Sequence, residues 1–485
     1  MTQRGTCGTN EPDLISWVNE NLKCMLAPDE EQGYWEKRSI YKVPAPVADL
    51  NHQAYWPQAV SFGPYHHDKN HLRPMESHKR RALLHFLRRS KKDVEDFLKP
   101  LSKVAQKLED SYDSLDPKWK KGGDKGTVSP FLELMIIDGC FMLEILRTMT
   151  RWGGNPIFGD PWTMTCEGGD YAINDPIFGE RGGLYIIPYI KRDMLMLENQ
   201  LPMLVLNSLV AVEKDSGQDG EYINGLLLKF FHPIRKRIKG MGERRHVLDV
   251  FRKSLLLPDK PVEERPGDGQ WIICMDKCRC VLDVFRKLLP KKPEGPEGWQ
   301  WIIGSATELE GAGIRLKNSN TGRKSNTGRL NDISFAGGVL RLPFIEVNDT
   351  TESMFLNLMT FERFHHGAGN EVTAYVFFMD DIINTERDVT LLITRGIIQN
   401  DFGSDEAVAK LFNSLNKDMT LHSINSLNAV REKVSKHCKK PWNRWRASLI
   451  QTHFGSPWSI LSLLAAIFLF TLTIIQTIYT VSPAG

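Results

Sequence analysis

Histidines and acids gather in one short stretch, GPYHHDKNHLRPMESH, which covers residues 63–78. Neutral imidazoles at close spacing bind zinc when a carboxylate completes the ligand set. The candidate ligands are His66, His67, Asp68, His71 and His78. Adjacent side chains such as His66 and His67 project in different directions unless the backbone bends. A turn held by hydrogen bonds is therefore the favoured interpretation, and a zinc site is the alternative.

Two Glu-x-x-His pairs suggest a second kind of metal chemistry. In a helical bundle, two such pairs and two further glutamates hold a di-iron centre. The pairs are Glu243–His246 and Glu362–His365, and the further candidates are Glu133 and Glu198. In a chain with 13 histidines, about one such pair arises by chance. Glu243 also lies in a basic stretch and not on an apolar helix face, so accidental spacing is the favoured explanation.

Other signatures of catalysis are missing from the sequence. It contains no G-x-S-x-G elbow, no Walker loop and no G-x-G-x-x-G after a strand. The cluster of Cys274, Cys278 and Cys280 has a spacing that fits no standard zinc pair. Eight cysteines in 485 residues indicate free thiols in a reducing compartment. We therefore expect no enzyme activity, no cofactor and no small-molecule substrate.

The charge balance argues against a nucleic-acid partner. A net charge of +3 produces no global field that would attract a polyanion. The basic and aromatic residues 229–239, with Arg244 and Arg245 after them, are explained at least as well by a solvated or membrane-facing surface as by RNA.

The elements that must position these side chains are mainly helices, because apolar residues recur at helical spacing in most of the chain. The predicted helices cover residues 75–89, 90–108, 131–147, 190–209 with a bend near Pro202, 350–366, 372–398 and 404–415. Short strands are predicted at 314–317, 333–342 and up to 347. The expected fold class is mainly α, a multi-helix globular body with a small β element, plus one C-terminal transmembrane helix.

Three acids lie on apolar helices of this body: Asp138, Asp193 and Glu198. An acid in such a place more often caps, pairs or hydrogen-bonds than catalyses, so we expect structural roles for all three. Ser90 and Asp93 resemble a capping box that opens the helix over 90–108.

A local duplication interrupts the body. VLDVFRK occurs at Val247 and again at Val281, and QWII occurs at Gln270 and again at Gln300. Two copies are too few for a solenoid. Gly, Pro and Lys dominate residues 258–298, which we expect to form an inserted or duplicated flexible loop.

The last thirty residues, 456–485, contain no charged side chain. Residues 458–481 would form a helix about 36 Å long, enough to span a hydrocarbon core of about 30 Å with some tilt. Trp458 and Tyr479 suit the two membrane interfaces. The residues predicted to form the anchor are Trp458, Leu463, Phe468, Ile474 and Tyr479. A short tail, 482–485, follows them.

A basic juxtamembrane segment, 431–457, precedes the anchor. Its basic residues include Lys433, Lys436, Lys439, Lys440, Arg444 and Arg446. The positive-inside rule therefore predicts a single-pass protein with a cytosolic body, on the plasma membrane or an endomembrane. The run would also contact anionic headgroups. The single sequon at Asn348 is weak evidence for the opposite orientation.

The order of motifs along the chain resembles the plant family of domain of unknown function 247, the UPF0481-like membrane proteins. The resemblance starts with IYKVPAPVADLNHQAYWPQAVSFGPYHH and continues through LELMIIDGCFMLEILR, IKRDMLMLENQLPMLVLNSL and ISFAGGVLRLPFIEVNDTTESMFLNLMTFER. It covers about Ile40 to Leu415. The expected family domain is 40–430, after a variable N-terminal segment, 1–39.

This resemblance implies a C-terminal membrane span and no established enzymatic activity, and it transfers no catalytic residues. Some family members look like recognition determinants in grass pollen–pistil self-incompatibility, and others are linked to stress or defence. The expected function is a membrane-anchored recognition or signalling component whose partners are the lipid bilayer and an unidentified protein. The alternative is a metal-dependent enzyme that uses the His66/His67 region or the Glu-x-x-His pairs.

Overall fold

The structure is a computed structural model of the chain. It describes residues 28–120, 129–151, 171–215, 220–232, 241–257, 303–319, 329–417, 427–440 and 465–477 without 467, and a few helical residues before 28. The duplicated block 258–298, the cysteines at 274, 278 and 280, and the segments 441–457 and 482–485 lie outside these ranges.

The N-terminal lobe is built around helix α9 (Pro130–Arg151). Helices α5 (Arg73–Ser90), α6 (Val94–Lys103), α12 (Met203–Lys214) and α13 (Gly220–Phe231) pack against it. Gly139 lets α12 approach closely, because a Cβ at this position would lie 2.6 Å from Leu209 Cδ1. The other elements of this lobe are α2 (Pro28–Lys37), α3 (Ala45–Ala48), α4 (His52–Tyr55), η1 (Asn70–Leu72), α7 (Ala105–Asp110), α8 (Pro117–Lys120), α10 (Glu180–Tyr185) and α11 (Ile187–Asp193).

The C-terminal lobe surrounds α17 (Thr351–Phe364), which packs against α18 (Glu371–Ile382) and α20 (Asp405–Leu415). Its other helices are α14 (Val247–Leu256), α16 (Ala306–Gly311), α19 (Glu386–Thr394) and α21 (Asn428–Cys438). Strands β1 (Arg315–Asn318), β2 (Ser334–Ala336) and β3 (Val339–Leu342) form a sheet of order β1-β3-β2. Parallel strands β4 (Ile345–Val347) and β5 (Ile398–Asn400) form a second, two-stranded sheet.

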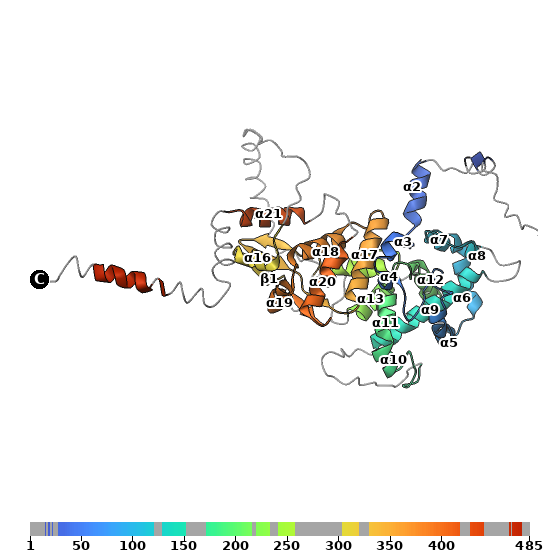
Figure 1. The fold of residues 1–485 in the computed structure, drawn as a ribbon. Helices are drawn as coiled ribbons and strands as arrows, with labels where there is room; N and C mark the ends of the chain where they lie inside the picture. The colour runs from blue at the N-terminus through green and yellow to red at the C-terminus, as the bar shows by residue number, and fades with distance from the viewer. Residues whose placement is uncertain are drawn as a thin grey trace, which may run out of the picture.

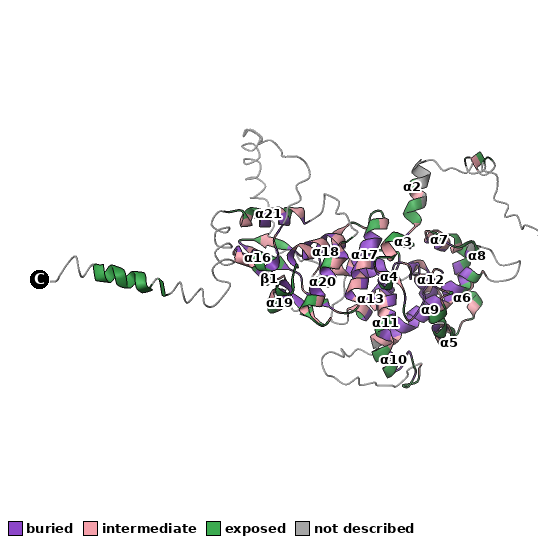
Figure 2. Ribbon diagram, viewed as in Figure 1, coloured by how far each residue is buried: buried purple, intermediate pink, exposed green. Residues whose placement is uncertain are grey.

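Figure 1 shows the two lobes side by side, with α9 and its neighbours in one and α17, α18 and α20 in the other. Each lobe has its own apolar core, and buried residues line the interior of both (Figure 2). Ala54, Tyr55 and Leu197, which come before α14 in sequence, also belong to the core of the C-terminal lobe, and α14 contributes Val247 to one core and Leu248 to the other. The seam between the lobes is therefore apolar, and it ties them into one body.

The observed fold confirms the mainly helical body with a small β element. Three predicted helices are wrong in extent. Residues 90–108 divide into α6 and α7, which are separated at Val104. Residues 190–209 divide into α11 and α12, separated by irregular backbone, and residues 372–398 divide into α18, α19 and β5. The predicted capping box also lies elsewhere, because Asp93 and Asp96 form the box of α6 and Ser90 ends α5.

The C-terminal segment is described at residues 465, 466 and 468–477, which are helical. Its large apolar side chains are exposed, among them Phe468 at 64% and Phe470 at 69% (Figure 2). Thr473 Oγ1 donates to the carbonyl of Leu469 at 2.8 Å, so its hydroxyl bonds back to the helix backbone. Within the described residues, no helix combines the length and the apolar character that crossing a bilayer requires.

Candidate functional site

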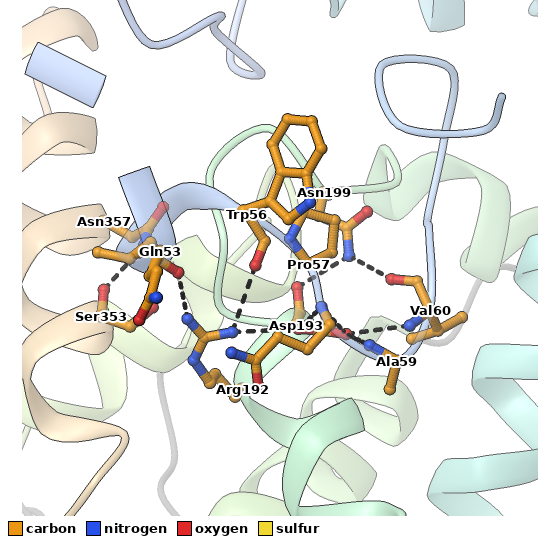
Figure 3. Close-up of polar contacts among 12 residues, drawn as sticks. Gln53, Trp56, Pro57, Ala59, Val60, Arg192, Asp193, Asn199, Ser353 and Asn357 are labelled. Carbon is orange, nitrogen blue, oxygen red and sulfur yellow. Dashed lines mark hydrogen bonds and ion pairs between the residues drawn. The ribbon is translucent and has the colours of Figure 1, made fainter. Parts of the chain in front are cut away.

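The most polar part of the interior surrounds residues 57–63, which we call the strap. The strap has no regular structure, so its backbone amides need partners from elsewhere. Asp193, at the end of α11, accepts the N–H groups of Gln58, Ala59 and Val60 at 2.6–3.0 Å (Figure 3). Burial raises the pKa of the Asp193 carboxyl to about 6, and the three backbone donors oppose the rise.

The rest of the strap is held in the same way. Asn199 Oδ1 accepts the N–H of Phe62 at 2.7 Å, and its Nδ2 donates to the carbonyl of Val60 at 3.0 Å. The N–H of Gly63 donates to Asp138 Oδ2 at 2.8 Å. Gly63 has φ +74°, and a Cβ there would lie 2.8 Å from the backbone oxygen of Gln200. The strap is therefore fixed by side chains of three distant elements.

A fully buried lysine completes this network. Lys79 Nζ lies 2.7 Å from Asp138 Oδ1 and 2.7 Å from Glu76 Oε1, and it donates to Ser61 Oγ at 3.2 Å. Burial raises the pKa of Asp138, and the Lys79 charge counters that rise. The network explains two of the three predicted structural acids, because Asp138 pairs with a cation and Asp193 accepts backbone amides.

The predicted zinc ligands after the strap do not converge. Each of them has its own partner: His66 Nε2 lies 3.1 Å from Glu198 Oε2, His67 packs on Trp119, Asp68 pairs with Lys118, His71 bonds to the carbonyl of Pro57, and His78 lies beside Arg81. Trp56 lies between two of these histidines, edge-on to His66 and stacked on His71. The stretch is a turn held by hydrogen bonds and ring contacts, as favoured above.

The structure does bring together the two histidines of the Glu-x-x-His pairs. His246 and His365 both contact the ring of Phe361, at centroid distances of 4.9 and 5.1 Å. The glutamates of the di-iron hypothesis do not gather around these histidines. Glu362 accepts Arg252 Nε at 2.7 Å and the N–H groups of Val372 and Thr373. Glu133 is exposed at the start of α9, and Glu198 pairs with His66.

The two histidines hydrogen-bond to Ser39 and Tyr41, near the N-terminal end of the described body. His246 Nδ1 accepts the N–H of Asp249, so its Nε2–H donates to the carbonyl of Ser39 at 3.0 Å. His365 Nδ1 lies 3.0 Å from the hydroxyl of Tyr41. Burial lowers the pKa of both histidines to about 4, so both rings are neutral at pH 7. Because both rings are neutral and hydrogen-bonded, they can pack against Phe361 in the interior.

No group of three or more His, Cys, Asp or Glu side chains within the described residues is placed to hold a metal ion. The arrangement that the di-iron and zinc hypotheses need is therefore not formed by the residues named for them above. The predicted cysteine cluster lies outside the described ranges.

The structure describes some of the residues that were predicted to face the membrane. Phe468 and Ile474 are exposed on the C-terminal helix, whereas Trp458, Leu463 and Tyr479 lie outside the described residues. The basic residues Lys433, Lys436, Lys439 and Lys440 are exposed on α21 or just after it, and Arg444 and Arg446 lie outside.

Sequence reasoning missed that α21 belongs to the body. Arg431 is 3% exposed, and its Nη1 lies 2.6 Å from Asp381 Oδ2 of α18. Its guanidinium also lies over the ring of Phe378, and Val434 is fully buried one turn further on. The spacing of Arg431 and Val434, three residues apart on one helix face, was the sequence signal for this packing. The helix spans the predicted boundary between residues 430 and 431.

Comparisons with known proteins cover most of the chain. A family model, DUF247, described as plant protein of unknown function, matches residues 40–472. A UPF0481 protein of Arabidopsis thaliana is 30% identical over 458 residues, which cover 91% of this chain and 86% of the relative. A putative UPF0481 protein of the same plant is 22% identical over 542 residues, which cover 96% of this chain and 94% of the relative.

No solved structure matches the chain. The family model therefore carries the assignment, since it matches far more than half of the 485 residues. The chain belongs to the plant DUF247 family.

Proposed function

We propose that this protein is a membrane-anchored recognition or signalling component that acts through contacts with another protein. The observation that carries the proposal is the C-terminal segment, where 24 uncharged residues follow a basic region. The described part of this segment is helical and exposes six large apolar side chains, at 468, 469, 470, 472, 474 and 475. Exposed apolar area of this kind marks an interaction with a membrane or another apolar surface.

The anchor supports a recognition role by a simple concentration argument. A protein confined to a membrane meets a partner on the same membrane at a raised effective concentration. The family resemblance points the same way, since some members look like self-incompatibility determinants and others are linked to stress or defence.

The proposal is non-catalytic because five buried acids and histidines have structural partners. Asp138, Asp193 and Glu362 hold a lysine, backbone amides and an arginine, and His246 and His365 are neutral packing groups. Elemental analysis of purified full-length protein tests this part. Zinc or iron at a stoichiometric level would contradict it.

Proximity labelling from the full-length protein tests the recognition role. We expect a defined set of membrane-associated neighbours that disappears when the chain ends at residue 457. An identical set of neighbours with and without residues 458–485 would contradict the proposal.

The orientation follows from the positive charge before the anchor, which favours a cytosolic body. Protease protection in sealed microsomes tests it, and we expect the body to be digested. The Asn348 side chain already accepts hydrogen bonds from Thr350 at 2.8 and 3.0 Å. A protected body glycosylated at Asn348 would contradict the orientation.

A further inference from the structure

The outer face of the three-stranded sheet is basic. Arg315 and Lys317 of β1 and Arg341 of β3 are exposed, and the residues between them, Leu316 and Leu340, are buried. The parallel register of β1 and β3 places Lys317 directly beside Arg341. Like charges on neighbouring strands repel each other. Within the described chain, none of these three side chains makes an ion pair, so the face lacks an internal counter-charge.

The sheet lies next to the second basic element, α21. The helix packs against β2, and the ring of His437 contacts the ring of Phe335 at a centroid distance of 5.4 Å. The buried ion pair between Arg431 and Asp381 fixes the rotation of the helix about its axis. This fixed rotation leaves four lysines exposed: Lys433, Lys436, Lys439 and Lys440.

We call the three sheet residues and these four lysines the basic surface. Three acids of the described chain lie near it. Glu432 pairs with Lys436, Asp332 lies half-buried just before β2, and the Glu308 charge is near enough to Cys438 to add to the effect of burial, which raises the pKa of that thiol. The connection between β1 and β2 contains Arg323, Lys324 and Arg329, and its one acid is Asp332. Seven basic side chains from three elements therefore outnumber these three acids.

We propose that the basic surface binds the phosphate and carboxylate headgroups of an anionic lipid bilayer and so fixes how the body lies on the membrane. The inference rests on the proposed function, because the bilayer is the one that holds residues 458–481. It goes further by naming the lipid class and by assigning Arg315, Lys317 and Arg341, which are far from the anchor in sequence.

The path of the chain favours a membrane as the occupant of this surface. Only residues 441–457 separate Lys440 from the uncharged segment, a reach of about 60 Å when fully extended. These residues include Arg444, Arg446 and two tryptophans but no acid, a composition that suits the headgroup region. The anchor therefore keeps the basic surface close to headgroups at a high effective concentration.

The test uses full-length protein in vesicles of phosphatidylcholine alone or of phosphatidylcholine with phosphatidylserine. A membrane-impermeant acylating reagent modifies exposed lysines, which mass spectrometry then quantifies. We expect acylation of Lys317 and the four α21-region lysines to fall several-fold on the anionic vesicles and to recover at high salt, which screens the attraction. Lys99, Lys103 and Lys107, exposed on α6 and α7 of the other lobe, serve as internal controls.

Variants separate the sheet from the helix. Each basic residue near an anionic surface contributes about fivefold to the contact equilibrium. Replacing Arg315, Lys317 and Arg341 by Gln should therefore lower the contact equilibrium about a hundredfold and weaken the protection of the α21-region lysines. The matched control, Lys99→Gln with Lys103→Gln and Lys107→Gln, should leave that protection unchanged.

Flotation of the same samples distinguishes the two proposals. Equal lysine acylation on both vesicle types, while the protein floats with both, would overturn the basic surface and leave the anchor standing. Flotation with the anionic vesicles alone would support the basic surface and overturn the anchor. A protein that floats with neither vesicle type would overturn both.

Discussion

The strap and the α21 region use charge in opposite ways. In the N-terminal lobe, Lys79, Asp138 and Asp193 are fully buried, and they hold the strap in place. In the C-terminal lobe, one buried ion pair docks α21, and the remaining charge of that region points outward. Buried charges are committed to structure, whereas exposed charges can be reached by a partner.

This difference in burial identifies candidate functional residues better than the search for catalytic motifs does. Of the histidines and acids that first suggest chemistry, His66, His246, His365 and Glu362 are buried, and each has a structural partner. The side chains that remain available lie at the α21 end of the molecule, from which the chain continues toward its uncharged terminus. Four predictions test this division, beginning with the largest expected effect.

The first prediction concerns the fully buried pair. Replacing Lys79 by Met leaves Asp138 buried without its cation, which costs about 3–5 kcal/mol of unfolding free energy. Urea unfolding measures the loss. The matched control is the exposed pair of Arg395 and Glu310, where Arg395→Gln should cost about 0–1 kcal/mol. Equal losses of unfolding free energy in Lys79→Met and Arg395→Gln would contradict the distinction between buried and exposed charges.

The second prediction concerns the acceptor of the strap. Asp193→Ala leaves three buried backbone donors without their acceptor and should cost about 2–4 kcal/mol. Asp193→Asn retains one acceptor oxygen, so it should cost less. If the alanine and asparagine variants have equal stability, the strap is not held by this side chain.

The third prediction concerns pH and the seam between the lobes. With a pKa of about 4 in the folded state and about 6.5 in the unfolded state, His246 binds fewer protons when folded. Its contribution to stability is therefore full above pH 6.5 and is lost as the pH falls toward 4, about 2 kcal/mol between pH 7 and pH 5.

Asp193 and Asp381, whose pKa values are raised to about 6, oppose this trend by favouring the folded state as the pH falls. The test therefore compares the pH dependence of unfolding in the wild type and in His246→Asn. The variant should lose less stability on acidification. If the wild type and the variant have the same pH profile, the His246 ring is more exposed to solvent than in the structure, and the prediction is wrong.

The fourth prediction concerns the docking of α21. Arg431→Met removes the ion pair with Asp381, whose side chain is 28% exposed and better hydrated than Asp138. The global cost should therefore be about 1 kcal/mol, smaller than for Lys79. Hydrogen exchange should accelerate in α21 and β2 but not in α9. Accelerated exchange throughout the molecule would show that α21 stabilises both lobes.

Much of this fold is predictable from local sequence. Helices α5 and α9 follow from apolar periodicity, and the start of α20 follows from Ser404, whose hydroxyl accepts the N–H of Ala407 at 3.1 Å. The first three strands follow from the alternation around Gly337 and Gly338, which both have positive φ in the turn between β2 and β3.

The break between α11 and α12 shows where local reasoning stops. Apolar residues continue through 194–202, so periodicity alone predicts one helix. In the structure, Gln200 Nε2 donates to the carbonyls of Met194 and Met196 at 2.7 Å, and this side chain takes the place of helical backbone donors. Pro202 then begins the next helix at its N-cap.

The site was predictable only in part. Structural roles for Asp138 and Asp193 follow from an acid on an apolar helix, and the structure confirms them. The lysine and the strap that they bind, and the docking of Arg431 on Asp381, depend on contacts between segments 50 or more residues apart in sequence. Short-range spacing carries no information about such partners.

The central claim is that residues 458–481 hold this protein in a bilayer. The most direct measurement is retention in phosphatidylcholine vesicles after an alkaline wash, for the full chain and for a chain that ends at residue 457. The account predicts that the full chain stays with the vesicles and the shortened chain is released in folded form. Release of the full chain into detergent-free solution would contradict it.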